Sequence, residues 1–238
     1  MTVEWSSAWQ ALIHHPLFGV GITLGAYQLA MAVYEKTRWV FLQPVLVSML
    51  TVIGILLACG LTFAEYKDSA AALTLFLGPT TVALAVPLFV NLRRIRQLFW
   101  PTFITLLLAG VVATVLGVTL AWAFGAEHIM LMSMAPKSVT SPIAMLVASQ
   151  IGGIAALAAV FVMITGIIGA IVGPSLLKRF GVQHPAALGM ALGLTAHAVG
   201  TARALQEGEE CGAFAALAMS LMGVFTAVLL PLAILLWL

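Results

Sequence analysis

Long apolar segments follow one another along almost the whole chain, and short linkers carry most of its charge. A helix needs about 20 apolar residues to cross the hydrocarbon core of a bilayer. Only helices and closed barrels satisfy their backbone hydrogen bonds there. Barrel strands are short and alternate in polarity, whereas these segments are long and continuously apolar. The sequence therefore predicts an all-α, polytopic membrane protein with a single transmembrane domain over residues 1–238.

Composition agrees with this fold class, because hydrophobic residues make up 63% of the chain and charged residues 8%. The net charge of +2 gives no reason to expect a nucleic-acid partner. Cys59 and Cys211 have no partner at a redox or metal-binding spacing, and no P-loop or catalytic cluster is found. We therefore predict no enzyme activity, no metal and no cofactor. Membrane spans are expected near residues 17–34, 39–63, 69–91, 101–124, 152–175, 185–205 and 212–236.

One polar stretch interrupts the apolar pattern between Pro136 and Pro142, and its residues are Lys137-Ser138-Val139-Thr140-Ser141. A residue before a proline favours extended backbone, so the helix should stop at Ala135. It should restart at Pro142, with Ser141 as the N-cap. A helix N-terminus carries partial positive charge and free N–H donors, and the lysine adds a full charge. The stretch therefore predicts a broken transmembrane helix with a site for a small anion.

The charged linkers indicate how residues 126–150, which contain this stretch, sit in the membrane. Loops rich in Lys and Arg favour the cytoplasmic face. If 126–150 enters and leaves by one face, the three basic loops 35–38, 93–96 and 178–179 share the cytoplasmic face. The loops 64–68 and 207–210 then lie outside. The charges thus favour a re-entrant hairpin at 126–150, and the alternative is an ordinary kinked span.

A weak internal repeat relates residues 77–85 to residues 192–200, which share glycine, threonine and small apolar residues. Under the predicted topology the two copies run in opposite directions. The chain would then consist of repeat-like halves near 39–124 and 126–238. Inverted repeats with interrupted helices are typical of secondary transporters, whose sites lie near the bilayer midplane. Chance alignment of small residues is the alternative.

The first copy of this repeat contains a second candidate break. A helix that restarts at Pro79, after Gly78, would leave the N–H groups of Thr80 and Thr81 facing the break. The alternative is a plain proline kink.

The second copy contains His197, which shares one helical face with Thr201. A histidine in such a segment can bind a carboxylate, carry a proton or bond neighbouring helices. Arg203 is expected to pair with Glu207, four residues further on. The predicted substrate-binding residues are Gly78, Pro79, Thr80, Thr81, Pro136, Lys137, Ser138, Thr140, Ser141, Pro142, His197 and Thr201.

Three stretches, residues 77–88, 136–144 and 196–202, resemble the signature stretches of the LrgB/CidB family. Gly78 stands where a glutamine can occur in the family, and Phe89 stands where a tyrosine is usual. The resemblance spans nearly the whole chain and implies a bacterial inner-membrane protein with a small LrgA/CidA-type membrane partner. Bacterial members are described as holin- or antiholin-like modulators of murein hydrolase activity and autolysis. A plastid member is a glycolate/glycerate translocator, and other relatives are linked to pyruvate.

The residues favour transport over lysis, because a lesion has no need of a lysine-bearing hairpin. We expect an oligomeric secondary transporter of small monocarboxylates that moves its substrate by an elevator-type motion. The carboxylate of this small organic anion would lie against Lys137 and the helix that begins at Pro142. The alternatives are a holin- or antiholin-like modulator and a passive pore.

Overall fold

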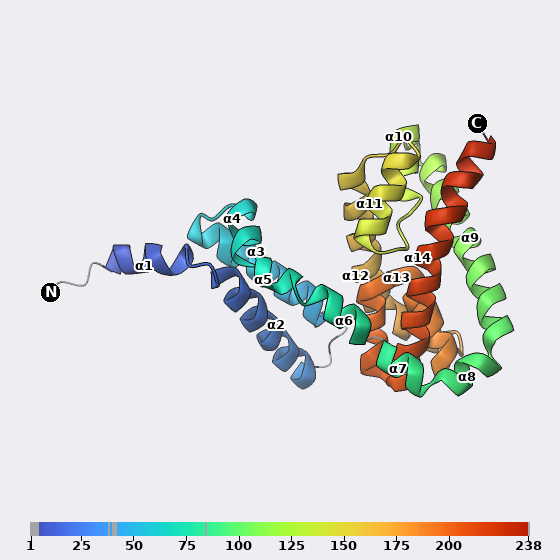
Figure 1. Ribbon diagram of the computed structural model, residues 1–238, viewed down its shortest axis with the longest axis horizontal. Coiled ribbons are helices and arrows are strands. Elements are labelled where there is room, and N and C mark those ends of the chain that lie inside the picture. Colours follow the sequence, from blue (N-terminus) through green and yellow to red (C-terminus); the bar gives the residue numbers. More distant parts are fainter. Residues whose placement is uncertain (1–4, 38, 40–41, 84, 238) are drawn as a thin grey trace. The chain divides into compact units, whose positions relative to one another are not determined.

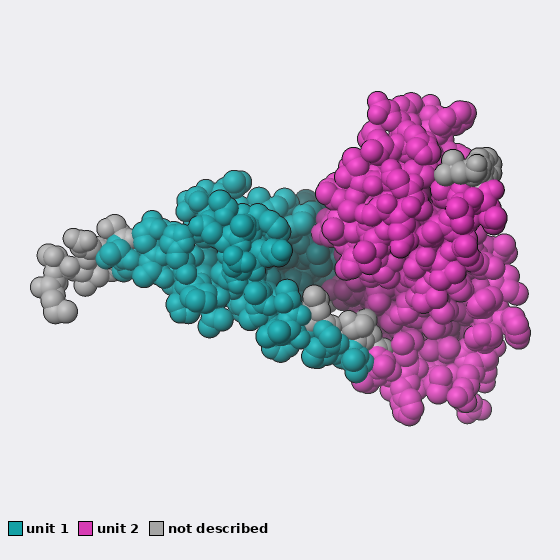
Figure 2. Space-filling view, turned by 45° about the horizontal axis from the view of Figure 1, so that its top comes forward, with its two compact units in different colours: residues 1–83 teal, residues 84–238 magenta. Residues whose placement is uncertain are grey.

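The computed structural model describes residues 5–37, 39, 42–83 and 85–237, which contain helices and turns but no strand. This confirms the predicted all-α class. The chain divides into two compact units, unit 1 over residues 1–83 and unit 2 over residues 84–238 (Figure 2). Each unit is described by itself.

Unit 1 is built on two bent helix pairs, and its cap residues explain where the helices begin and end. Its helices are α1 (Trp5–Ile13), α2 (Phe18–Thr37), α3 (Pro44–Cys59), α4 (Phe63–Ser69), α5 (Ala71–Thr74) and α6 (Leu77–Ala83). Helix α3 ends at Gly60, whose φ of 68° suits glycine. Thr62 and Glu65 then form a capping box that starts α4. The backbone N–H of Gly19 donates to Ser69 Oγ at 3.1 Å, which joins α2 to the end of α4.

Unit 2 contains the longest helices and two hairpins. Its helices are α7 (Ala85–Val90), α8 (Leu92–Gln97), α9 (Phe99–Ala123), α10 (His128–Met134), α11 (Ser141–Gln150), α12 (Ala155–Arg179), α13 (Pro185–Glu207) and α14 (Glu209–Trp237). Helices α9, α12 and α14 are long and apolar enough to cross a membrane. The bent pairs α1–α2 and α3–α4 raise the number of candidate spans among the described residues to five.

Most predicted spans coincide with these helices, but the span predicted at 69–91 is not a single helix. Residues 71–90 form three short helices, and the first break falls at Leu75 and Phe76. Helix α6 runs through Pro79, so the chain does not restart at that proline. A proline within the first turn of a helix removes no intrahelical hydrogen bond. The position of Pro79 in the sequence therefore did not determine where the helix is interrupted.

The predicted hairpin at 126–150 is present and is called the first hairpin. It consists of α10, the turn 135–140 and α11. The backbone N–H of Ile154, just after α11, donates to the Oγ of Ser133 in α10 at 2.8 Å. Leu131 and Ile151 belong to one buried cluster. Helix α11 therefore returns beside α10, and both ends of the hairpin lie at the same end of the unit (Figure 1).

Helix α13, predicted as a single crossing, instead turns back on itself at His197 and forms the second hairpin. His197 has φ 42° and ψ −127°, which is not helical. A Cβ on Gly200 would collide with the carbonyl oxygen of Leu192. These residues would be about 12 Å apart in a continuous helix. The arms are residues 185–196 and 198–207, and α13 occupies the opposite part of unit 2 from the first hairpin (Figure 1).

This reversal corrects the predicted topology. Lys178 Nζ lies 2.7 Å from Glu207 Oε2, and Arg94 Nε lies 3.4 Å from Glu210 Oε1. The acidic loop 207–210 therefore shares a face with the basic loops 93–96 and 178–179, and its predicted outside position is wrong. These two basic loops do share a face, as predicted. Acidic residues contribute little to the rule that basic loops favour the cytoplasmic face. The charge of the loop 207–210 therefore did not determine on which side of the membrane it lies.

The second hairpin packs tightly on α14 through small residues. A Cβ on Gly189 or Gly193 would collide with the backbone of Cys211 or Ala215, respectively. Four alanines of α14 are fully buried or nearly so, and they are Ala213, Ala215, Ala216 and Ala218. Missing and small side chains let the two backbones touch, which favours helix association inside a membrane.

The reversal at His197 can be tested by thiol labelling in a variant that lacks Cys59 and Cys211. Single cysteines at Arg94, Lys178 and Gly208 should react with an impermeant reagent from the same side of the membrane. A cysteine at Glu127, beyond the far end of α9, should react from the other side. Position 208 reacting from the side of position 127 would contradict the second hairpin.

Candidate functional site

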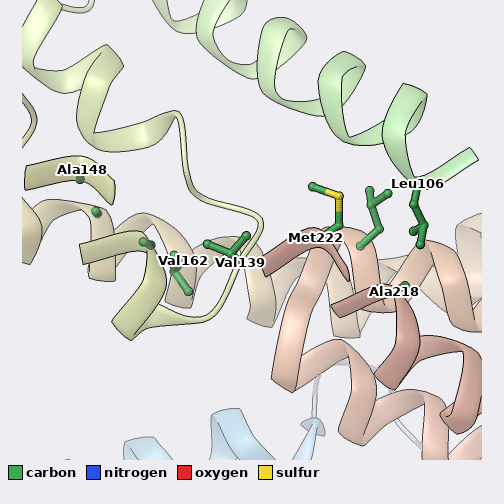
Figure 3. Close-up of a cluster of buried hydrophobic side chains, with 9 residues drawn as sticks. Leu106, Val139, Ala148, Val162, Ala218 and Met222 are labelled. Carbon is green, nitrogen blue, oxygen red and sulfur yellow. The ribbon is translucent and has the colours of Figure 1, made fainter. Parts of the chain in front are cut away.

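Both hairpins contribute residues at or near their tips to one buried cluster inside unit 2. Val139 of the first tip and Leu194, one turn before the second tip, belong to one buried cluster with Val162 and Met222. Figure 3 shows Val139 beside Val162, with Met222 further along the cluster. Each hairpin spans only part of the unit, so its tip ends among buried side chains instead of reaching the far face.

Lys137 lies in the turn of the first hairpin and is half-buried. Its Nζ donates to the carbonyl oxygen of Ala113 in α9 at 3.0 Å. A Cβ on Gly117 would lie 2.8 Å from the same Nζ, so this glycine leaves room for the ammonium group. Among the described residues, no carboxylate lies within ion-pair distance of Lys137. A backbone carbonyl neutralises no charge, so the ammonium keeps its capacity to bind an anion.

His197 forms the turn of the second hairpin and is 3% exposed. Its Nε2 lies 2.9 Å from the carbonyl oxygen of Val162 in α12. A carbonyl can only accept, so Nε2 carries the proton and Nδ1 is unprotonated in the neutral ring. The hydroxyl of Thr201 donates to the carbonyl oxygen of His197 at 2.8 Å. These two bonds hold a backbone conformation that non-glycine residues rarely adopt and that often marks functional sites.

The remaining residues of the first tip lie close to their predicted positions in the chain break, with two corrections. Pro136 and Ser138 are buried, and Pro142 lies near the start of α11. The N-cap is Thr140 (φ −68°, ψ 149°) and not Ser141, which is already helical. Such a one-residue shift is within the usual uncertainty of helix ends.

Ala135 is the second correction, because it remains helical (φ −50°, ψ −45°) although a proline follows it. The turn that follows is closed by the Lys137 N–H, which donates to the carbonyl of Met134 at 3.0 Å. Ala135 therefore has the helical conformation that a following proline normally disfavours, and the turn after it is closed by this local hydrogen bond.

The other predicted break belongs to unit 1. Gly78 and Pro79 are exposed in α6 of unit 1. The side chains of Thr80 and Thr81 lie outside the described residues. The site built from the hairpin tips comes from unit 2 alone.

Arg203 and Glu207 form the predicted pair, at 2.6 Å, at the base of the second hairpin. Lys178 also bonds Glu207, at 2.7 Å. Burial acts to raise the pKa of Glu207, but the Lys178 hydrogen bond and the Arg203 charge outweigh it, and the pKa is lowered. The carboxylate therefore stays ionised at neutral pH and fixes the base of the hairpin to α12.

Sequence reasoning missed the backbone partners of the two tips, Ala113 and Val162. The sequence does contain one signal for them, because a glycine lies near each. Gly117 follows Ala113 by one turn, and a Cβ on Gly166 would lie 2.7 Å from the imidazole of His197. A glycine in the middle of a transmembrane helix indicates that another group approaches closely.

Comparison with known proteins gives one consistent result. The model of the LrgB-like family matches residues 23–236. A protein of Bacillus mycoides (strain KBAB4), named antiholin-like protein LrgB, is 32% identical over 218 residues, which cover 91% of this chain and 95% of the relative. Proteins of the same name from Bacillus cereus (strain B4264) and Bacillus anthracis (strain CDC 684 / NRRL 3495) are 31% identical over the same shares. No solved structure matches the chain.

Replacing His197 by alanine should destabilise the protein by about 0.5–1.5 kcal/mol, because it removes the buried hydrogen bond between the imidazole Nε2 and the Val162 carbonyl. Replacing it by glutamine should recover part of the loss through the amide donor. Thr119→Ala is the matched control, since that hydroxyl bonds only to its own helix. Thermal unfolding of the purified protein in detergent measures all three. Equal melting temperatures for His197→Ala and Thr119→Ala would show that the bond to Val162 contributes nothing.

Proposed function

Since the chain belongs to the LrgB-like family, we propose from its paired hairpins that it is a secondary transporter of small monocarboxylates in the bacterial inner membrane. The observation that carries the proposal is the ammonium group of Lys137, which lies at an interior hairpin tip and is bound to a backbone carbonyl. An ionisable residue within a membrane segment is costly and is functional by default.

The substrate class follows from the charges and donors around this tip. One ammonium group without a carboxylate partner balances one monoanion. The first turn of α11 adds backbone N–H groups and the positive end of a helix dipole. Ser138, Thr140 and Ser141 supply hydroxyls next to the lysine, which suits 2-hydroxy and 2-keto acids such as glycolate, glycerate or pyruvate. His197, at the second tip, would contribute a further contact to the substrate. The hydrogen bonds of His197 to Val162 and of Thr201 to His197 hold this tip in place.

Alternating access is proposed to proceed by an elevator-type motion of the hairpins. Interrupted helices that meet at mid-depth from opposite ends of a bundle support this, because secondary transporters commonly bind their substrates at such places. Repeat-like halves near 39–124 and 126–238 remain part of the proposal and rest on the matching residues 77–85 and 192–200.

A second candidate function is an antiholin-like modulator of murein hydrolase activity and autolysis. The names of the relatives support this candidate more directly than they support transport. Such a role would involve self-association or a small LrgA/CidA-type membrane partner. The two candidates differ in one measurable property, which is the selectivity of the permeation they cause.

Lys137→Ala should reduce uptake of labelled glycolate or pyruvate into proteoliposomes at least ~100-fold, while the protein stays folded, because the anion loses its only full counter-charge. Lys137→Arg should also be poor, since a planar guanidinium replaces a compact ammonium group in the space beside Gly117. Thr119→Ala should transport normally. Wild-type uptake by Lys137→Ala would remove this residue from the site.

Saturation separates the two candidate functions. A carrier exposes its site to one face at a time, so uptake should saturate, and unlabelled acid inside the vesicles should accelerate entry of labelled acid. A lesion should release a neutral dye without saturation. Dye release as fast as glycolate uptake, with an LrgA/CidA-type partner present, would overturn transport and favour the second candidate.

A further inference from the structure

A cavity of about 580 Å³ lies between α9 and the first arm of the second hairpin. Its lining begins at Leu98 and His184, beside the charged loops, and reaches Ala113 and Thr195. Along α9 this is a length of about 22 Å. The carbonyl oxygen of Ala113 accepts the hydrogen bond from Lys137, so the inner end of the cavity lies at the residue that holds the ammonium group.

The wall of this cavity contains an unusual threonine. Thr102 is 3% exposed, and its hydroxyl has no hydrogen-bond partner among the described residues. Helical threonines usually bond back to their own helix, as Thr195 and Thr201 do here. No fully enclosed side-chain oxygen among the described residues lacks a partner, so the Thr102 hydroxyl reaches the open space of the cavity. Thr105, one turn above, adds a second hydroxyl to the wall.

The outer end of the cavity carries positive charge. His184 belongs to the lining, and its Nε2 lies 3.1 Å from Nη2 of Arg94. Arg94 also contacts Glu210, at 3.4 Å, and Arg93 and Arg96 lie on the same short helix. Glu210 balances the charge of Arg94, so the positive charge near the mouth comes from Arg93 and Arg96, which form no ion pair among the described residues. With Lys137 at the inner end, these charges attract anions into a cleft with apolar walls.

We propose that this cavity is a water-filled vestibule through which a small organic anion reaches Lys137 from the face of Arg94 and Lys178. Thr102 and Thr105 contact the anion along the way, and the structure is open to this face. The identity of the anion in the vestibule rests on the proposed transport function, whereas the cavity itself does not. A cleft filled by lipid chains is the competing outcome of the test below.

Thiol reactivity tests the vestibule, because a thiolate forms only where water reaches. Single cysteines are placed at Thr105, which lines the cavity, and at its neighbour Ile104, which is 51% exposed and does not line it. The two positions are consecutive in α9, so they differ by only about 1.5 Å along the helix axis. In a variant lacking Cys59 and Cys211, an anionic, water-soluble methanethiosulfonate should modify Thr105→Cys at least ~10-fold faster than Ile104→Cys. Thr105→Cys should react only when the reagent is added on the side of the membrane from which it modifies Arg94→Cys.

Equal, slow rates at positions 104 and 105 would mean that lipid fills the cleft, and they would overturn the vestibule. Modification of position 105 from the opposite side would overturn it as well. Glycolate or pyruvate should slow the labelling of Thr105→Cys. If labelling follows the expected pattern and neither acid slows it, the vestibule stands and the proposed substrate class falls.

A second variant pair tests the contact with the anion by transport. Thr102→Val keeps the shape of the side chain and removes the hydroxyl, so it should raise the KM for uptake severalfold. Thr102→Ser keeps the hydroxyl and should restore most of the wild-type KM. An unchanged KM in Thr102→Val would exclude this hydroxyl from the path. Saturable uptake together with unreactive Thr105→Cys would disprove the vestibule and leave the transport function intact.

Discussion

A membrane segment can turn back in apolar surroundings only if its free backbone groups find partners, because no water is available there. Unit 2 meets this requirement with single side chains at the base of the first hairpin and at the turn of the second. The Oγ of Ser133 accepts from Ile154 N–H and donates to the carbonyl of Ile129 at 2.6 Å. Thr201 satisfies the carbonyl of His197, and His197 itself bonds Val162. These few hydrogen bonds hold the base of the first hairpin and the tip of the second.

Close packing makes the second turn possible as well as stable. Gly166 leaves space for the imidazole, and Gly189 and Gly193 let the first arm touch the backbone of α14. Inside a bilayer, such contacts replace the hydrophobic driving force that holds helices together in water. The salt bridges of Glu207 then fix the base of the hairpin, where water is near. The hairpin is therefore held at its tip, along its length and at its base by different interactions.

Continuous apolar segments predicted most of the long helices, the two prolines predicted the break between Pro136 and Pro142, and the four-residue spacing predicted the Arg203–Glu207 pair. These features depend on local rules that a sequence displays directly. The turn at His197 does not, because alanines flank it and no proline or glycine occupies it. Its positive φ is imposed by contacts with α12 and α14, which are distant in sequence. The candidate site was therefore half predictable: Lys137 could be found from its prolines, but the orientation of His197 could not.

The hydrogen bond between Lys137 and a backbone carbonyl has an electrical consequence. A full charge that crosses a membrane responds to its potential by about 2.3 kcal/mol per 100 mV. A hairpin that carried Lys137 across the bilayer while empty would therefore be driven or opposed by voltage. The same hairpin with a monoanion bound would be neutral, so the membrane potential would not affect its movement. A potassium diffusion potential that makes the vesicle interior positive would then accelerate net uptake, because it drives the empty, positively charged hairpin back outward, yet it would leave exchange of one acid for another unchanged. An equal response of both would show that the charge of Lys137 stays still.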